Sequence, residues 1–333
     1  MSKWYDDKSN NSDVVMYSKI CLVRNLADTV FPSRMNDEQM KSVAKRIFAS
    51  IKNSPVAKEF DMVNLAELTK AKALSFAEKN LAEKEFCLSS KSSYLLLSQN
   101  EDLSIMCNYE NHITITSFAP GQNLIQAYNK ANDIDDILID SLKIAFNSKL
   151  GFLTSSPVNL GTGLKASLIL HLPALAQGDV ISKLASMISK LGLTLTPLYE
   201  NAQGDIYVLS NQVTLGITEK SAIENVNAVC EQIINQERKA RNILKESPDF
   251  EDKIYRTLGI LKLARRLSVD EFLNSISLVR LGISMNYFDY SYSLIEEMIY
   301  NLFDASLVDN SKSDLTKDMC DSLRAQIIRE KLG

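Results

Sequence analysis

The chain has 333 residues, of which 45% are hydrophobic and 23% are charged, a composition typical of a soluble globular protein with one large domain or two ordinary ones. Its net charge of −4 and its pI near 5.5 give no reason to expect nucleic acid as a partner. No apolar run reaches the ~18–20 residues that span a bilayer, and the N-terminus is polar rather than signal-like, so we expect a cytoplasmic protein that does not enter a membrane.

The cysteines and histidines argue against a metal site. The five cysteines are scattered along the chain, odd in number and without a C-x-x-C pair, which favours reduced thiols over a disulfide scaffold or a zinc site. The chain has two histidines, and we therefore predict no metal ligands.

The first half of the chain predicts an antiparallel sheet backed by helices. Residues 1–13 are polar, and we expect disorder at their tip. Asn36 or Asp37 is suited to cap the first helix. In order, hydrophobic spacing and turn residues predict a strand at 14–25, helices at 36–53 and 65–80, strands at 94–98, 103–107 and 113–118, and a helix at 124–146.

The second half predicts a change of architecture. Helices are expected at 176–191 and 221–245, with strands between them. The basic run at 238–241 has acidic neighbours and is interpreted as a solvated helix face. Residues 246–249 break the long helix, which predicts domains at 1–247 and 248–333. The second domain is expected to be all helical, with breaks near 268–270, 282 and 309–313.

A glycine-rich stretch lies at the centre of the chain, in the sequence GFLTSSPVNLGTGLKAS from Gly151 to Ser167. Gly161 and Gly163 permit a tight turn that exposes N–H groups to an anion, and Lys165 adds a positive charge nearby. From the residues alone, an ordinary turn is the favoured interpretation, because a short Gly-Thr-Gly loop is more often a turn than a phosphate site.

The sequence of this stretch resembles the signature of the ATP:guanido phosphotransferases, the family of creatine and arginine kinases. That signature is roughly G-Y-L-T-S-C-P-T-N-L-G-T-G-L-R-A-S. Ser156 replaces the family's reactive cysteine, and Lys165 replaces an arginine. The resemblance implies an α+β fold in which an antiparallel sheet flanked by helices precedes an all-helical C-terminal domain. It also implies ATP and Mg²⁺ as cofactors.

The resemblance assigns nucleotide-binding roles in this sequence. The family binds the phosphates with five arginines, whose places are taken here by Lys19, Cys21, Thr114, Lys165 and Thr196. It also assigns cofactor binding to Gly161, Gly163, His112 and Asn211. From spacing alone, Lys19 is a solvated strand lysine and His112 a strand-end histidine with a structural hydrogen bond.

Two glutamates are the catalytic candidates. Glu110 matches the family's acidic position that orients the guanidinium and takes its proton, as a carboxylate can hold a guanidinium fork. Tyr109 replaces the neighbouring glutamate of the family pattern. Glu200 corresponds to a loop glutamate, in a substrate loop that is a few residues shorter here.

The C-terminal region resembles that of the bacterial protein-arginine kinases, the McsB type. Asp321 and Arg324 match a motif that docks phosphoarginine and supports self-association, whereas Cys320 replaces its leading arginine. From the residues alone, this is a routine helix-surface pair. The resemblance implies protein clients, a homodimer, an McsA-like activator and a Clp-type unfoldase as partners.

Three functions remain open. The leading hypothesis is a divergent protein-arginine kinase homologue in bacterial protein quality control, with weak or lost phosphotransfer. The first alternative is an active kinase with Glu110 as base and with Lys19 and Lys165 on the phosphates. The second is a scaffold that binds no nucleotide. Arg24 is a candidate to replace a missing arginine.

Overall fold

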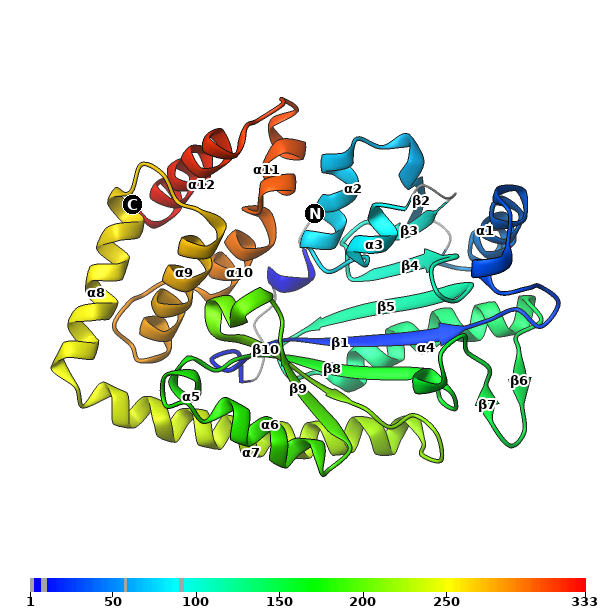
Figure 1. Cartoon of the computed structure of the whole chain (residues 1–333), viewed down its shortest axis with the longest axis horizontal. Coiled ribbons are helices and arrows are strands. Elements are labelled where there is room, and N and C mark those ends of the chain that lie inside the picture. Colours follow the sequence, from blue (N-terminus) through cyan, green and yellow to red (C-terminus); the bar gives the residue numbers. More distant parts are fainter. Residues whose placement is uncertain (1–2, 7–10, 57–58, 90–92) are drawn as a thin grey trace.

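The computed structural model describes residues 3–6, 11–56, 59–89 and 93–333. Its centre is an eight-stranded antiparallel sheet in the order β2-β3-β4-β5-β1-β8-β10-β9, with a separate hairpin of β6 and β7 (Figure 1). The strands are β1 (Val15–Arg24), β2 (Phe60–Asn64), β3 (Tyr94–Ser98), β4 (Leu103–Cys107), β5 (Ile113–Pro120), β6 (Phe146–Asn147), β7 (Gly151–Phe152), β8 (Leu164–His171), β9 (Leu193–Pro197) and β10 (Ile206–Asn211). The predicted α+β class is confirmed.

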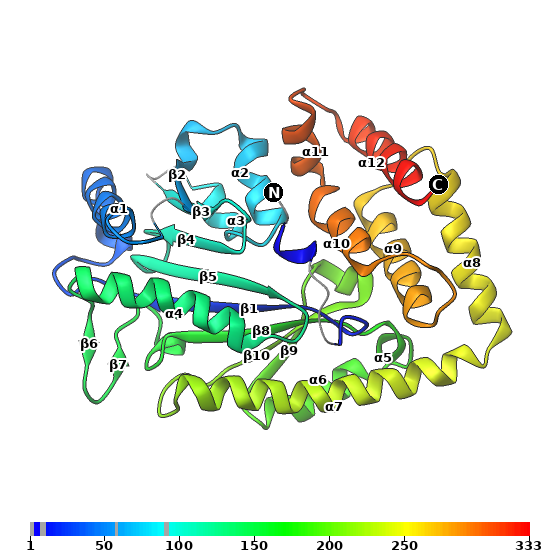
Figure 2. The same cartoon turned by 180° about the vertical axis from the view of Figure 1, so that it is seen from behind.

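Helices pack on both faces of the sheet and extend beyond one end of it. The α-helices are α1 (Asp37–Lys52), α2 (Lys70–Glu78), α3 (Lys84–Cys87), α4 (Leu124–Ser141), α5 (Pro173–Gln177), α6 (Ile181–Ser189), α7 (Glu219–Lys245), α8 (Pro248–Leu263), α9 (Val269–Ser284), α10 (Tyr292–Asn301), α11 (Asp304–Ser311) and α12 (Lys317–Leu332). The helices α8 to α12 form a group at one end of the sheet, and the long helix α7 leads into it (Figures 1 and 2).

The strand β1 divides two hydrophobic cores because successive side chains point to opposite faces. Ile20 and Leu22 belong to the core beneath α1, α4, α6 and α7. Tyr17, on the opposite face, belongs to a core that also contains Phe272 of α9 and Tyr300 of α10. The sheet face that carries Tyr17 is therefore the face on which the helical group packs.

Much of the predicted order of elements is confirmed. The first helix has Asn36 as its N-cap, with a reciprocal capping box to Gln39. Other helices are shorter than predicted. The segment 65–80 begins with a 3₁₀ turn before Thr69 caps α2, and the segment 124–146 leaves the helix after Ser141. The segment 176–191 divides into α5 and α6 at Gly178 and Asp179.

Gly282 does not break a helix as predicted. It lies inside α9, which continues to Ser284 before Asn286 adopts a φ of +62°. A Cβ atom at position 282 would lie 2.6 Å from the ring of Phe288, so glycine is needed there for close packing. Position 282 therefore requires glycine because of close packing against Phe288, and not because the chain turns there.

The basic run of α7 is exposed at Arg238 and Lys239, as predicted, but the prediction is wrong for Arg241. Arg241 is buried; its guanidinium donates to Glu237 Oε1 at 2.7 Å and to the His171 carbonyl at 3.0 Å. Arg280 of α9 is also buried and donates to the Asp13 carbonyl at 2.9 Å. This network joins the sheet, α7 and the helical group, and the amphipathic pattern of one helix could not reveal partners from other elements.

The predicted disorder of the N-terminus is wrong for the residues that the structure describes there. Trp4 to Asp6 form a 3₁₀ helix, η1, which lies between β5 and α10 (Figure 1). Trp4 is buried there, with its ring against Phe118 of β5 and Tyr300 of α10. Residues 1–2 and 7–10, which share that prediction, lie outside the described residues.

Candidate functional site

The five positions matched to phosphate-binding arginines lie on one face of the sheet. Cys21 of β1 is opposite Thr116 of β5 on one side and Lys165 of β8 on the other. Residues that pair across strands share a face, and so do residues two apart along a strand. By this register the same face carries Lys19, Thr114 and Thr196. We call Lys19, Cys21, Thr114, Lys165 and Thr196 the lysine face.

The positive charge on the lysine face is sparse. Lys165 is exposed, whereas Lys19 is half-buried with its ammonium 5.8 Å from the centre of the Phe118 ring. Cys21 lies between them, and burial raises the pKa of its thiol although both lysines act to lower it. Cys21 is therefore a neutral thiol near pH 7, and Thr114 is a buried neutral hydroxyl.

Arg24 is not free to supply a missing charge. Its side chain is 3% exposed and forms a buried ion pair with Asp135 of α4 at 2.6 Å. The same guanidinium donates to the carbonyls of Val23 and Thr162, and its centre lies 3.5 Å from the centre of the Phe152 ring. The suggestion that Arg24 rescues nucleotide binding is therefore wrong, since its donors hold β1, α4 and the glycine-rich stretch together.

Asn25, Asn111 and His112 form a hydrogen-bonded junction between segments that are far apart in sequence. Asn25 donates to Asn111 Oδ1 at 2.7 Å and accepts from the His112 amide at 2.9 Å. The Ser155 amide also donates to Asn111 Oδ1. These bonds connect the end of β1, the turn before β5 and the stretch after β7.

His112 has both ring nitrogens engaged inside the protein. Nδ1 accepts from the Leu26 amide at 3.2 Å, so Nε2 carries the proton and donates to the Val30 carbonyl at 2.9 Å. Burial lowers the pKa of His112, and its ring stacks on Phe31. This geometry matches the structural role that its spacing suggested, and its role in cofactor binding stays a prediction.

Backbone hydrogen bonds to other parts of the protein also hold the glycine-rich turn. The Gly161 and Thr162 amides donate to the carbonyls of Phe152 and Thr214. Gly161 has a φ of +109°, and a Cβ there would lie 2.3 Å from the Thr214 carbonyl oxygen. At Gly163 a Cβ would lie 2.6 Å from Arg24 Nη1. These glycines allow close packing, and the two named amides face the protein rather than an anion.

Asn211, the last residue of β10, forms hydrogen bonds with the first residues of β8. Its Oδ1 accepts from the Ala166 amide at 2.7 Å, and its Nδ2 donates to the carbonyls of Leu164 and Val213. We call the internally bonded set Arg24, Asn25, Asn111, His112, Gly161, Gly163 and Asn211 the motif frame.

The two catalytic candidates are exposed at the ends of different loops. Glu110 lies in the turn between β4 and β5, and Glu200 begins the 3₁₀ segment η6 (Glu200–Asp205) after β9. This segment packs on the helical group, because the Gly204 amide donates to Asn274 Oδ1 and the ring of Tyr199 lies 5.4 Å from that of Phe303. Among the residues that the structure describes, no contact joins Glu110 to Glu200, so their shared role stays a prediction.

Asp321 and Arg324 form an internal pair beside a cavity. Arg324 is fully buried, so the helix-surface interpretation is wrong. Its guanidinium donates to the carbonyls of Leu302 and Leu267, to Asp321 Oδ1 at 2.8 Å and to Asp304. With these acceptors engaged, Arg324 holds α12 against α11.

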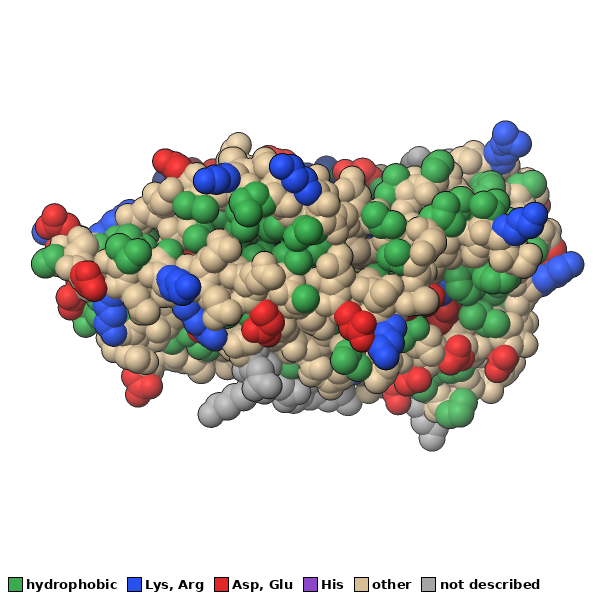
Figure 3. Space-filling view, turned by 90° about the horizontal axis from the view of Figure 1, so that it is seen from below, with side chains coloured by type: hydrophobic (Ala, Val, Ile, Leu, Met, Phe, Trp, Pro, Cys, Tyr) green, Lys and Arg blue, Asp and Glu red, His purple; other side chains and the backbone are tan. Residues whose placement is uncertain are grey.

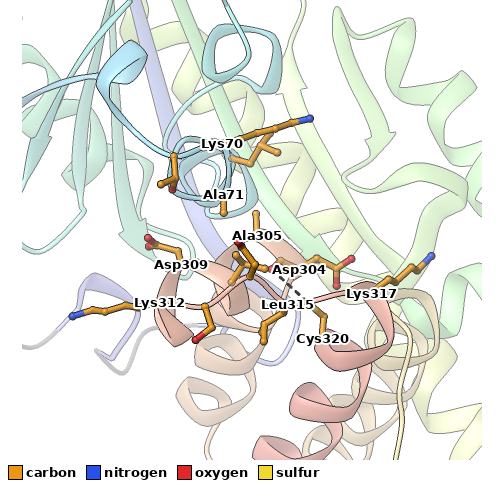
Figure 4. A pocket seen from close by; sticks show the side chains of 14 residues that line it. Lys70, Ala71, Asp304, Ala305, Asp309, Lys312, Leu315, Lys317 and Cys320 are labelled. Carbon is orange, nitrogen blue, oxygen red and sulfur yellow. Dashed lines mark hydrogen bonds between the residues drawn. The ribbon is translucent and has the colours of Figure 1, made fainter.

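The cavity next to this pair has a volume of about 880 Å³ and lies between α2, α11 and α12 (Figure 4). Cys320 lines it and points toward Asp304, whereas Lys312 and Lys317 extend outward at the rim (Figure 4). Docking of phosphoarginine at Asp321 and Arg324 stays a prediction.

Across the described chain, no helix has the length and apolarity needed to cross a membrane. Within the same residues, no group of three or more His, Cys, Asp or Glu side chains is arranged to hold a metal ion. On the face seen in Figure 3, cationic and anionic side chains are interspersed with hydrophobic ones.

Sequence reasoning missed Asp135 and Trp4. Asp135 lies on the buried stripe of α4 beside Ala131, Ile134 and Leu138, and an acid at such a position signals a buried cationic partner. Trp4 is the single tryptophan of the chain and lies in a polar terminal segment. A large aromatic side chain in such a segment signals an anchored terminus.

Comparison with known proteins agrees with this fold. Residues 40–240 match the model of the ATP:guanido phosphotransferase C-terminal catalytic domain, and residues 247–333 match that of the protein-arginine kinase McsB C-terminal domain. The chain belongs to the ATP:guanido phosphotransferase family of kinases, in its McsB-type branch. A protein-arginine kinase of Clostridium tetani is 33% identical over 338 residues, covering 100% of this chain and 99% of that protein. One of Clostridium novyi is 35% identical over 339 residues, with 100% and 98% coverage.

Solved structures of related kinases share the fold. The duplicated taurocyamine kinase of Schistosoma mansoni aligns with a TM-score of 0.65 at 21% identity, over 76% of this chain and 38% of that longer one. Lombricine kinase aligns with a TM-score of 0.60 at 16% identity, over 69% and 68% of the two chains.

Proposed function

We propose that this chain is a protein-arginine kinase homologue in which phosphotransfer is weak or lost and which acts by binding. The observation that carries the proposal is the lysine face, where two of the five positions matched to phosphate-binding arginines hold a cation. Phosphoryl transfer depends mainly on positioning and on positive charge around the phosphates. Each charge-assisted hydrogen bond is worth ~1.5–3 kcal/mol, so the loss of three lowers the rate by roughly three to six decades.

The two remaining cations support ATP and Mg²⁺ as the ligands of this face, at reduced affinity. Lys19 lies two residues before Cys21 on β1, and Lys165 is opposite Cys21 on β8, and each offers one point charge in place of a planar guanidinium fork. The motif frame supplies no further guanidinium to the phosphates, because the Arg24 side chain is bound to Asp135. Binding without efficient transfer is the expected result.

A second candidate, an active protein-arginine kinase, is favoured by Glu110. This carboxylate is exposed on a turn that the motif frame holds beside β5, where it is free to accept a guanidinium or its proton. In that case Glu110→Gln abolishes turnover. Under either candidate, a role in protein quality control with an McsA-like activator or a Clp-type unfoldase is a proposal from family resemblance.

The test is mass spectrometry for phosphoarginine on casein and on the chain itself, after incubation with Mg-ATP. A relative named protein-arginine kinase serves as the positive control in the same reaction. We expect phosphoarginine at least about a thousandfold below the control, following the lost charge-assisted bonds. Formation at a comparable rate, abolished by Glu110→Gln, contradicts the proposal and establishes the active kinase.

A further inference from the structure

The segment η6, which begins with Glu200, has a backbone that residues other than glycine rarely adopt. Asn201 and Ala202 have φ values of +54° and +55°, and Asp205 has a φ of +52°. This left-handed region crowds the Cβ atom against the following carbonyl, and Ala202 has no polar side chain that could compensate. Such a conformation persists only where the surrounding structure enforces it. The contacts of η6 identify what enforces it here.

The helix α9 of the helical group holds the second half of η6. The Gly204 amide donates a hydrogen bond to Oδ1 of Asn274, an exposed side chain of α9, at 3.1 Å. Gly204 packs so closely on α9 that a Cβ there would lie 3.3 Å from the Leu273 carbonyl oxygen. Ser277 of α9 donates to Asp205 Oδ2 at 3.3 Å. Two hydrogen bonds and one close backbone contact thus fix this half of η6 to α9.

The first half of η6 is anchored as well. The Ala202 amide donates to the carbonyl of Tyr199, whose ring lies against that of Phe303 in the helical group. At the base of the loop, the Leu198 amide donates to the Ile206 carbonyl at 2.9 Å. This bond closes the loop directly after β9 and directly before β10, so the short segment between them has no spare length to extend along the sheet.

Strand register places Glu110 and Glu200 toward opposite ends of the sheet. Glu110 precedes β5, which begins opposite the last residue of β1. Glu200 follows β9, which ends level, through β10 and β8, with the first residue of β1. At the rise of an extended strand, the ten residues of β1 span about 30 Å. In both views η6, green by the colour bar, lies beside α9 and α10, away from the turn between β4 and β5 (Figures 1 and 2).

We propose that Asn274 is a positioning residue: with Ser277 it fixes η6 on the helical group and so keeps Glu200 apart from Glu110. A guanidinium held by Glu110 then meets one carboxylate instead of two, and a single carboxylate orients the guanidinium fork less completely. The role of Glu110 toward a guanidinium rests on the proposed function. The separation of the two glutamates rests on the contacts of η6 and on strand register.

The distance between positions 110 and 200 can be measured by double electron–electron resonance between two nitroxide labels. Both side chains are exposed, and of the five cysteines only Cys21 is not buried. The labels are therefore attached to Glu110→Cys and Glu200→Cys in a chain that also carries Cys21→Ser. We expect one narrow distribution near about 30 Å, unchanged by Mg-ATP with free arginine. A population at less than half that distance, with or without these ligands, overturns the proposal.

Variants at position 274 separate positioning from a general loss of stability. Asn274→Ala removes the acceptor of the Gly204 amide, and we expect the distance distribution to broaden in a chain whose circular dichroism is unchanged. Asn274→Asp keeps an acceptor oxygen and should restore the narrow distribution. The matched control is Asn225→Ala, which removes an exposed asparagine bond from α7 to the Leu191 carbonyl and should leave the distribution narrow.

Two results overturn the proposal in this second experiment. One is a distribution in Asn274→Ala that is as narrow as in the parent chain, and the other is equal broadening in Asn225→Ala. None of these readouts involves phosphotransfer, so the positioning of Glu200 can fail while the proposed function holds. Conversely, efficient phosphoarginine formation would contradict the proposed function and leave the distance measurement as it stands.

Discussion

The motif frame and the lysine face meet along β1, where Arg24 belongs to one and Cys21 to the other. The Arg24 guanidinium donates hydrogen bonds to Asp135 and to two backbone carbonyls, all inside the protein. Cys21 offers a neutral thiol to a surface between two lysines. The family's residues persist where they bond to other parts of the fold, and they are replaced where a ligand's phosphates are expected. The match to the family signature is therefore stronger evidence for the fold than for phosphotransfer activity.

The largest expected effect lies in the motif frame. Arg24→Met leaves the Asp135 carboxylate buried without its partner, and we expect a loss of about 3–5 kcal/mol in the free energy of unfolding, measured by urea denaturation. The matched control is Arg46→Met, which breaks an exposed pair with Asp28 and should change stability by less than about 1 kcal/mol. Equal effects of the two substitutions would contradict the assignment of Arg24 to the motif frame.

A glycine comparison gives the next largest effect. Gly161→Ala forces a Cβ onto the Thr214 carbonyl at a φ of +109°, and we expect a loss of about 2–3 kcal/mol. Gly259→Ala, in the interior of α8 with open space around it, should instead gain about 0.5–1 kcal/mol. Thermal denaturation of both variants decides whether the Gly161 turn is a packing device. If Gly161→Ala is neutral, the turn is looser than the structure indicates.

The pH dependence of the free energy of unfolding tests His112 of the motif frame, with a smaller expected effect. Burial lowers the pKa of His112 in the folded state, so below its ordinary value near 6.5 the unfolded chain binds more protons. Stability should therefore fall as the pH drops from about 6.5 toward 5. His112→Gln removes this contribution, while His171 remains in both proteins. A difference between the two stability curves that does not vary with pH would contradict a buried, neutral His112.

The smallest effect on stability is expected on the lysine face. Lys165→Ala removes an exposed side chain and should change the free energy of unfolding by less than about 0.5 kcal/mol. The same variant should weaken Mg-ATP binding in isothermal titration, if the lysine face holds the phosphates. A large loss of stability would place Lys165 in the fold rather than in a binding surface.

The sequence predicted the parts of the fold that local patterns determine. The N-cap at Asn36, one of the two predicted candidates, and the strands at 94–98 and 103–107 follow from neighbouring residues, and the structure has them at those positions. The burial of Arg241 and the docking of Trp4 follow from residues distant in sequence, and no local pattern contains them. The family resemblance matched five positions to phosphate-binding arginines, and the strand register places them on one face of the sheet, while their role in binding stays a prediction. It could not show that Arg24 is already bound to Asp135.

The most direct test of the account is the Mg-ATP affinity of the wild type beside that of Cys21→Arg, measured by isothermal titration calorimetry. The substitution returns a guanidinium to the centre of the lysine face, opposite Lys165. One charge-assisted bond of ~1.5–3 kcal/mol predicts an affinity increase of about 10- to 150-fold, with unfolding stability otherwise preserved. An unchanged affinity in a folded variant would contradict the claim that missing positive charge, rather than another feature of the site, limits nucleotide binding.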